Sequence, residues 1–153
     1  MYQSPSPEFL EPQWFFPLFA LLWVTITGLL AILGGWATLA TYFRAGDAVE
    51  GERFRFVSGS MGARFLPVHY GSCLFVTVNE TGFRLSIFFP FRLWSPPLFI
   101  PWNAVASVEL KRFLFFRYAV IHLRDQWPRI SVRGSAGQRI EQAYARIFGS
   151  NVP

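Results

Sequence analysis

The feature that most constrains this chain is a long uncharged stretch near its N-terminus. No charged residue occurs between Glu11 and Arg44. A helix needs about 20 apolar residues to cross the ~30 Å hydrocarbon core of a bilayer, and this stretch is longer than that. A helix that is apolar on every side over such a length is rare in a soluble protein. The sequence therefore predicts one transmembrane helix over residues 14–43, preceded by a short tail at residues 1–13.

A cleaved signal peptide is the alternative interpretation of this stretch. Such a peptide has basic residues before a short apolar core. Here the N-terminal flank has no lysine or arginine but carries Glu8 and Glu11, and the stretch is about twice the usual core length. Trp14, Trp36 and Tyr42 lie toward its two ends, as aromatic residues at membrane interfaces do. These features favour an uncleaved span.

The charges around the stretch predict its orientation. The N-terminal flank is acidic, whereas all 14 basic residues of the chain follow the stretch, beginning with Arg44. By the positive-inside rule, the basic side stays in the cytoplasm. We therefore expect a single-pass protein of the inner (plasma) membrane, with its N-terminus outside and its C-terminal domain in the cytoplasm. The basic domain would be attracted to the anionic leaflet, although the same arginines also suffice to set topology and solubility alone.

Small residues recur on one side of the predicted span. Thr27, Ala31 and Gly35 are four positions apart, a spacing that lets another helix approach closely. The spacing also arises by chance in a span rich in alanine, glycine and threonine. These three residues are therefore a candidate helix–helix face, either for a homo-oligomer or for association with a larger membrane complex.

After the span, the pattern changes to the alternation that is typical of β-strands. Residues 44–70 are rich in glycine and charge and predict a juxtamembrane connector, with room for a first strand. Asn79 and Gly82 suit a tight turn between two alternating segments. Within the predicted domain, residues 71–149, alternation and turn residues indicate short antiparallel strands at 74–78, 83–89, 98–101, 104–110, 118–124 and 129–132.

A helical period replaces the alternation near the C-terminus. Ser135 and Gln138 have the spacing of a capping box, and Gly149 is a suitable stop. Short antiparallel strands closed by one C-terminal amphipathic helix are the order expected of an α+β, mainly β, barrel like that of pleckstrin-homology (PH) domains. The apolar stripe that would dock this helix on the sheet consists of Ile140, Ala143, Tyr144, Ile147 and Phe148.

The middle of the domain resembles a known family. The Gly-Phe-Arg-Leu phrase at 82–85, the Pro-Pro bend at 96–97 and the Ile-Pro-Trp phrase at 100–102, followed by Val105 and Val108, are similar to bacterial PH-like and GRAM-like domains. The whole layout is similar to small bacterial membrane proteins with one N-terminal span and such a domain. The resemblance covers residues 70 to 148. It implies a membrane-associated PH-like fold and offers no catalytic residues.

Residue types that carry chemistry are few and scattered. The single cysteine, Cys73, excludes an internal disulfide, and with His69 it provides too few ligands for a metal. The sequence contains no phosphate-binding loop, no nucleophile elbow and no evident pair of carboxylates. We therefore expect no enzyme activity and no cofactor. Nucleic-acid binding is not expected either, because the basic residues do not gather on one predicted element.

Two aromatic segments are candidate contact surfaces. The segment at residues 88–94 has Arg92 as its only charge and suits either packing under the barrel or a groove for a partner. The segment at residues 111–117 suits rings inserted among lipid headgroups with cations on the phosphates, or a hairpin whose rings lie partly in the core. This segment comprises Lys111, Arg112, Phe113, Phe115, Phe116 and Arg117 around one leucine.

The sequence therefore predicts a membrane-anchored, non-catalytic PH-like module. It would bind a partner protein or anionic lipid headgroups at the inner membrane face. The alternative prediction is an accessory subunit of a larger membrane complex, which associates through its transmembrane helix.

Overall fold

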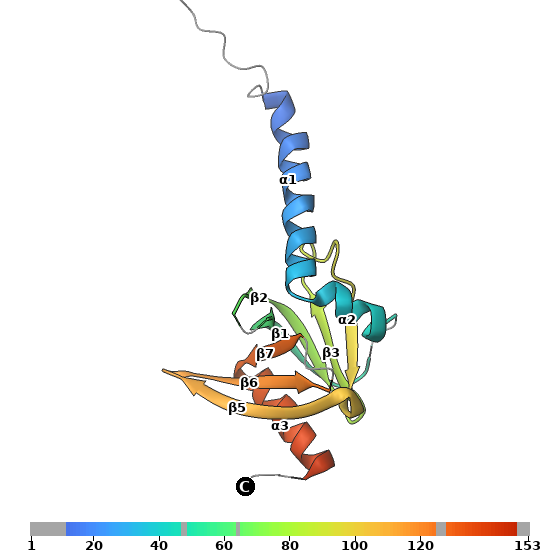
Figure 1. The fold of residues 1–153 in the computed structure, drawn as a ribbon, viewed down its shortest axis with the longest axis vertical. Helices are drawn as coiled ribbons and strands as arrows, with labels where there is room; N and C mark the ends of the chain where they lie inside the picture. The colour runs from blue at the N-terminus through green and yellow to red at the C-terminus, as the bar shows by residue number, and fades with distance from the viewer. Residues whose placement is uncertain (1–11, 47–48, 64, 125–127, 150–153) are drawn as a thin grey trace, which may run out of the picture.

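The computed structural model describes residues 12–46, 49–63, 65–124 and 128–149. In that part of the chain, two N-terminal helices, seven strands and a C-terminal helix follow one another (Figure 1). The helices are α1 (Pro12–Leu33), α2 (Trp36–Phe43) and α3 (Gly134–Phe148), with a short 3-10 turn, η2 (Trp102–Ala104), between two strands. The strands are β1 (Glu52–Gly62), β2 (Pro67–Val78), β3 (Gly82–Ile87), β4 (Leu98–Pro101), β5 (Val105–Phe113), β6 (Phe116–Leu123) and β7 (Arg129–Arg133).

Helix α1 extends away from the rest of the molecule (Figure 1). It is long and apolar enough to cross a membrane. Its 22 residues cover about 33 Å at 1.5 Å per residue, close to the thickness of the hydrocarbon core. Most of its large apolar side chains are exposed, which suits a helix covered by lipid rather than by protein. The predicted apolar span is therefore present. Most of the predicted tail, up to residue 11, lies outside the described residues.

The predicted span over residues 14–43 is nevertheless not one helix. α1 ends at Leu33, and Gly35 takes the left-handed backbone conformation, with φ at 76°. Glycine adopts this conformation without the steric cost that other residues meet, so the chain turns here. α2 then packs on the domain and buries Trp36 and Leu39. Trp36 was expected at the membrane interface, but it is fully buried in the core. Its indole N–H donates to the carbonyl of Pro96 at 2.8 Å, which satisfies the polar group of this buried ring.

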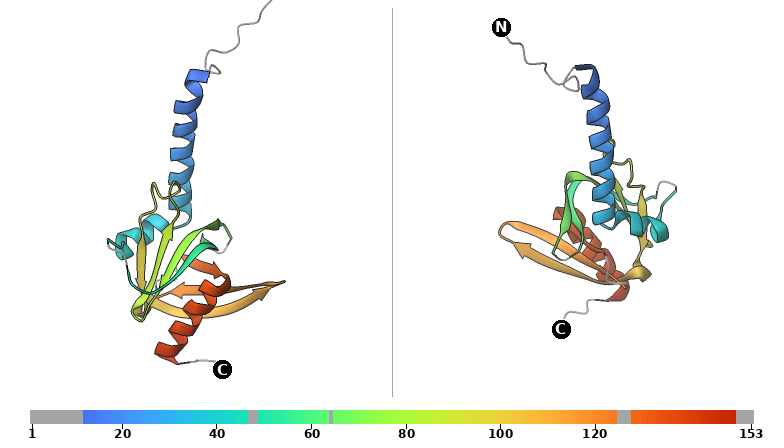
Figure 2. Two further views of the ribbon diagram at one scale, coloured as in Figure 1. Left: turned by 180° about the vertical axis from the view of Figure 1, so that it is seen from behind. Right: turned by 45° about the horizontal axis from the view of Figure 1, so that its top comes forward.

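Within the described residues, the strands form one antiparallel sheet of seven, curved into a half-barrel (Figure 2). Their order is β4-β3-β2-β1-β7-β6-β5. The predicted connector, residues 44–70, does contribute the first strand, β1, and it also supplies the start of β2, so more of it belongs to the sheet than the alternation indicated. The predicted turn between β2 and β3 is confirmed: Asn79 Oδ1 accepts hydrogen bonds from the backbone N–H groups of Thr81 and Gly82 at 2.9 and 3.0 Å.

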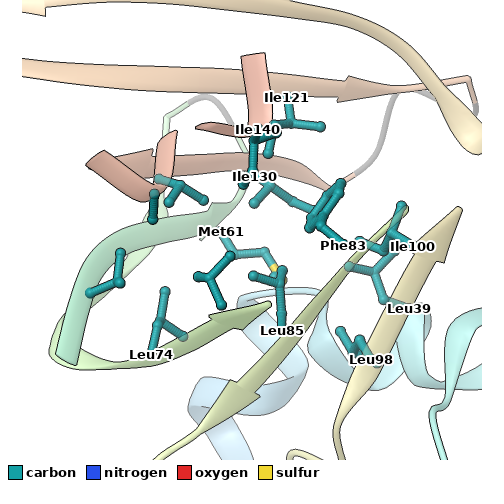
Figure 3. Packing of buried hydrophobic residues seen from close by; sticks show 14 of the residues in the cluster. Leu39, Met61, Leu74, Phe83, Leu85, Leu98, Ile100, Ile121, Ile130 and Ile140 are labelled. Atoms are coloured by element: carbon teal, nitrogen blue, oxygen red, sulfur yellow. The ribbon is translucent and has the colours of Figure 1, made fainter. Parts of the chain in front are cut away.

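The core lies inside the half-barrel and is closed by helices. Figure 3 shows Ile140 of α3 beside Ile121 and Ile130 of the sheet, with Phe83 nearby. α3 packs mainly on β5, β6 and β7, whereas α2 places Leu39 near the β4 end of the sheet. The predicted C-terminal helix and its stop are confirmed, since Gly149 follows α3 with φ at 76°. The fold is a half-barrel of antiparallel strands with a C-terminal helix, preceded by an apolar helix.

Candidate functional site

The β5–β6 hairpin carries every residue of the predicted segment 111–117. Leu114 and Phe115 form its turn, between the end of β5 and the start of β6. The hairpin projects sideways from the domain, on the side away from α2 (Figures 1 and 2). Its rings are exposed, with Phe115 at 91% and Phe113 at 65%. The structure therefore does not place these rings in the core, which was one of the two expectations for this segment.

The three cations of this segment take different places. The Lys111 Nζ lies 3.5 Å from the carboxylate of Glu109. Arg112 donates its Nε–H to the carbonyl of Leu114 at 3.3 Å, within the hairpin turn. Arg117 lies on a groove between the hairpin and α3. Only Arg117 therefore joins a larger cluster of cations.

This groove, of about 530 Å³, brings three arginines together. Arg117 lines it with Arg55 of β1 and Arg133 at the end of β7, and all three residues are exposed. Among the described residues, none of the three forms an ion pair, and no acidic residue lines the groove. The guanidinium of Arg133 also lies over the Phe116 ring, 5.8 Å from its centroid. The sequence pattern did not reveal this cluster, because its members are far apart along the chain and meet only in the folded sheet.

The first turn of α3 forms one wall of the groove. The predicted capping box between Ser135 and Gln138 is absent, because β7 runs to Arg133 and Gly134, with φ at 71°, starts the helix directly. No side chain caps the helix among the described residues. The N–H groups of a first turn point out of the helix and carry the positive end of its dipole. They add to the positive potential of the arginines and favour an anionic ligand such as a phosphate group.

Aromatic rings connect the groove to α1. Phe56 lines the groove and packs against Phe75 and Phe88, with ring centroids 5.6 and 6.1 Å away. Phe88 opens the loop between β3 and β4, in which the Phe91 ring lies 5.0 Å from that of Trp23 in α1. Phe56, Phe88 and Phe91 are all more than 40% exposed. An exposed aromatic surface therefore runs from the hairpin groove to the apolar helix, and surfaces of this kind mark contacts with proteins or membranes.

The predicted helix–helix face is covered by the chain itself. Thr27, Ala31 and Gly35 are buried, although most of α1 is exposed. An apolar pocket of about 230 Å³ separates Thr27 and Ala31 from Tyr70 of β2 and from the β3–β4 loop. The small residues therefore face β2 and the β3–β4 loop of the same chain. This corrects the expectation that the face is open to another helix, and the accessory-subunit alternative loses this support.

Tyr70 and Cys73 lie at this pocket, and neither has the properties of a reactive group. Burial, with a smaller contribution from Cys73, raises the pKa of Tyr70 to about 12. The Tyr70 hydroxyl has no hydrogen-bond partner within the described part of the chain. Burial also raises the pKa of the Cys73 thiol, which keeps it in the unreactive protonated form. No group of three or more His, Cys, Asp or Glu residues suited to a metal occurs among the described residues.

Comparison with known protein families and with curated proteins finds no match for this chain. The resemblance to bacterial PH-like domains therefore stays a prediction. The half-barrel and its C-terminal helix are consistent with that prediction.

Proposed function

We propose that this chain is a membrane-anchored, non-catalytic PH-like module that binds anionic phospholipid headgroups at the inner face of the membrane. α1 anchors the domain, and the excess of basic residues after α1 favours a cytoplasmic domain. The observation that carries the proposal is the convergence of Arg55, Arg117 and Arg133 in one groove, directly beside the exposed rings of the hairpin.

The chemistry of the groove suits a phosphate group on a lipid. Guanidinium groups bind phosphate oxygens through pairs of parallel hydrogen bonds, and these charge-assisted bonds are about twice as strong as neutral ones. The adjacent Phe115 and Phe116 are exposed at 91% and 57%. Inserting one such ring among lipid chains stabilises the contact by roughly 1.5–3 kcal/mol. A soluble phosphate compound would use the arginines but leave the rings in water.

The anchor changes what this lipid contact has to achieve. Because α1 already holds the domain at the membrane, the hairpin does not have to recruit it. A modest affinity is sufficient to fix how the domain is oriented against the bilayer, since the lipid is present at high effective concentration. The exposed aromatic rings between α1 and the groove would then also contact the membrane surface.

The test uses the full chain, because Trp36 and Leu39 belong to the core and a domain cut after α2 would lose them. A fluorescent label is placed at the hairpin turn through Leu114→Cys in a Cys73→Ser background, and the protein is reconstituted in nanodiscs. Nitroxide groups on the lipid headgroups then quench the label when the hairpin touches the bilayer. We expect quenching in discs that contain phosphatidylglycerol and much less in discs of phosphatidylcholine alone.

The groove variant Arg117→Gln with Arg133→Gln should lower this quenching to the level seen in neutral discs. The matched control is Arg146→Gln, which removes an exposed arginine from α3 outside the groove. A label that is equally unquenched in both kinds of disc contradicts lipid binding. If the groove variant then loses a protein that co-purifies with the native chain, the groove binds a protein partner instead.

A further inference from the structure

The loop between β3 and β4, residues 88–97, lies alongside α1 (Figure 1). The Trp94 indole N–H donates to the carbonyl of Val24 at 3.2 Å. Gly28 lies beside this ring, and a Cβ there would be in ordinary van der Waals contact with the indole, at 3.5 Å. Val24 lies about 14 Å before Leu33 along the helix axis, at 1.5 Å per residue. Where α1 crosses a membrane, this loop therefore lies against the half of α1 that is next to the domain.

Part of the backbone in the loop is paired. Unpaired backbone N–H and C=O groups are costly in hydrocarbon, so irregular chain is tolerated there only when its polar groups are paired. The N–H of Phe91 donates to the carbonyl of Phe88 at 2.9 Å, and the N–H of Ser95 donates to the carbonyl of Arg92 at 3.1 Å. The carbonyl of Pro96 accepts from the Trp36 indole. The loop is thus a pair of turns with large apolar side chains and the charged Arg92 on the outside.

One side of the Trp94 ring borders an apolar groove of about 400 Å³ on α1. The groove extends over more than two turns of the helix, from Val24 to Ile32, and Ala37 of α2 lies at its lower end. Every lining residue except Thr25 is apolar or glycine. A groove that follows a transmembrane helix has the direction of the lipid chains around it. It therefore fits an acyl chain.

Trp94 also lines a basic depression of about 570 Å³. Arg44, which follows α2, and Arg92 of the loop both line it. Neither arginine forms an ion pair with another described residue. The pKa of Arg84 in β3 is lowered, mainly by burial and then by the nearby charges of Arg92 and Arg53. Two exposed guanidinium groups that have no carboxylate partner among the described residues, next to an apolar helix, match the phosphate of a lipid.

We propose that Arg44, Arg92 and Trp94 form a second, separate lipid site that holds one anionic phospholipid against α1. The phosphate lies between the two guanidinium groups, and an acyl chain occupies the apolar groove that Trp94 also lines. This lipid connects the loop, α1 and the end of α2. The site rests on the proposed membrane crossing of α1, but not on the hairpin groove, which is built from different residues.

The test uses the full chain in nanodiscs of phosphatidylcholine with a small share of a photoactivatable phosphatidylglycerol, whose acyl chain carries a diazirine. After illumination, mass spectrometry locates the labelled residues. We expect labels around Val24 to Ile32 and on Trp94. The variant Arg44→Gln with Arg92→Gln should lower this labelling about tenfold, as expected for the loss of charge-assisted hydrogen bonds. Arg146→Gln, away from the site, should leave the labelling unchanged.

Three outcomes would overturn this site. If the double variant is labelled as strongly as the native chain, Arg44 and Arg92 do not bind the lipid. If a phosphatidylcholine probe labels the chain as strongly as the phosphatidylglycerol probe, the groove contacts only ordinary boundary lipid. Displacement of the probe by soluble glycerol phosphate shows a site for free phosphate compounds. The hairpin variant Arg117→Gln with Arg133→Gln should not affect the labelling, so the two lipid proposals can fail separately. Extraction of the chain from membranes by alkaline carbonate would remove the basis of both.

Discussion

Two aromatic segments of similar composition, residues 88–97 and 111–117, have different surroundings in the folded chain. Both combine phenylalanine with arginine. The first is held against α1 and α2 by two indole donors, Trp94 to Val24 and Trp36 to Pro96. The second is a hairpin whose rings are exposed. Its turn is held by a hydrogen bond from its own Arg112 to the carbonyl of Leu114. The comparison teaches that specific donors, rather than hydrophobicity, decide which aromatic segment is held by the protein.

The largest effect should follow from removal of the indole that holds the first segment to α2. Trp36 is fully buried, packs on Tyr70 and donates to Pro96. Trp36→Ala should lower the free energy of unfolding by about 3–5 kcal/mol, through a large cavity and an unpaired carbonyl. Guanidinium unfolding of the full chain in mild detergent, followed by circular dichroism, measures this. The control Tyr42→Ala, on the exposed side of α2, should change it by less than about 0.5 kcal/mol.

The next effect concerns the buried tyrosine behind the first segment. The folded chain raises the pKa of Tyr70 from 10.0 to about 12, so folding favours the neutral phenol. This contribution to stability is present below pH 10 and is lost as the pH rises from 10 to 12. The loss should be roughly 2–3 kcal/mol. Tyr70→Phe, unfolded in parallel over that pH range, should lose less stability, and identical curves for both proteins would contradict the prediction.

A smaller effect should come from the close approach of α1 to β2. A Cβ at Gly34 would lie 2.8 Å from the Tyr70 hydroxyl and 2.9 Å from the carbonyl oxygen of Leu30. Gly34→Ala should therefore lower the free energy of unfolding by about 1–3 kcal/mol, as other overpacked sites do. Gly71→Ala is the matched control, because nothing lies within 4 Å of a Cβ there. Equal stability of the two variants in detergent would show that this contact adapts freely.

The smallest change in stability should occur in the second segment. Phe115 is 91% exposed, so Phe115→Ser should alter the free energy of unfolding by less than about 0.5 kcal/mol. The same substitution should weaken nitroxide quenching of the label at position 114 in anionic nanodiscs, because one inserted ring is lost. Ile147→Ser, on the distal part of α3, is the control and should leave the quenching unchanged. A destabilised Phe115→Ser variant would mean that this ring is held by the protein after all.

Local signals were sufficient for much of the fold. The charge-free stretch predicts α1, because a bilayer requires one continuous apolar helix. Alternation on both sides of a turn that contains Asn79 and Gly82 predicts the β2–β3 hairpin. The helical stripe that ends at Gly149 predicts α3. Each of these features depends on residues that are close together in the sequence. The hairpin residues 111–117 were recognised for the same reason, because rings and cations are adjacent there.

The tertiary structure alone decided where the helix breaks and where the cations meet. Gly34 and Gly35 are compatible with a continuous span, and only the packing of Trp36 under Pro96 selects the break. Arg55, Arg117 and Arg133 meet because β7 pairs with β1 on one side and with β6 on the other in the curved sheet. The sequence by itself determined an apolar helix long enough to cross a membrane and a β-rich basic domain, since both follow from local patterns. The position of each arginine and each ring relative to the membrane depends on contacts between distant segments, which periodicity does not specify.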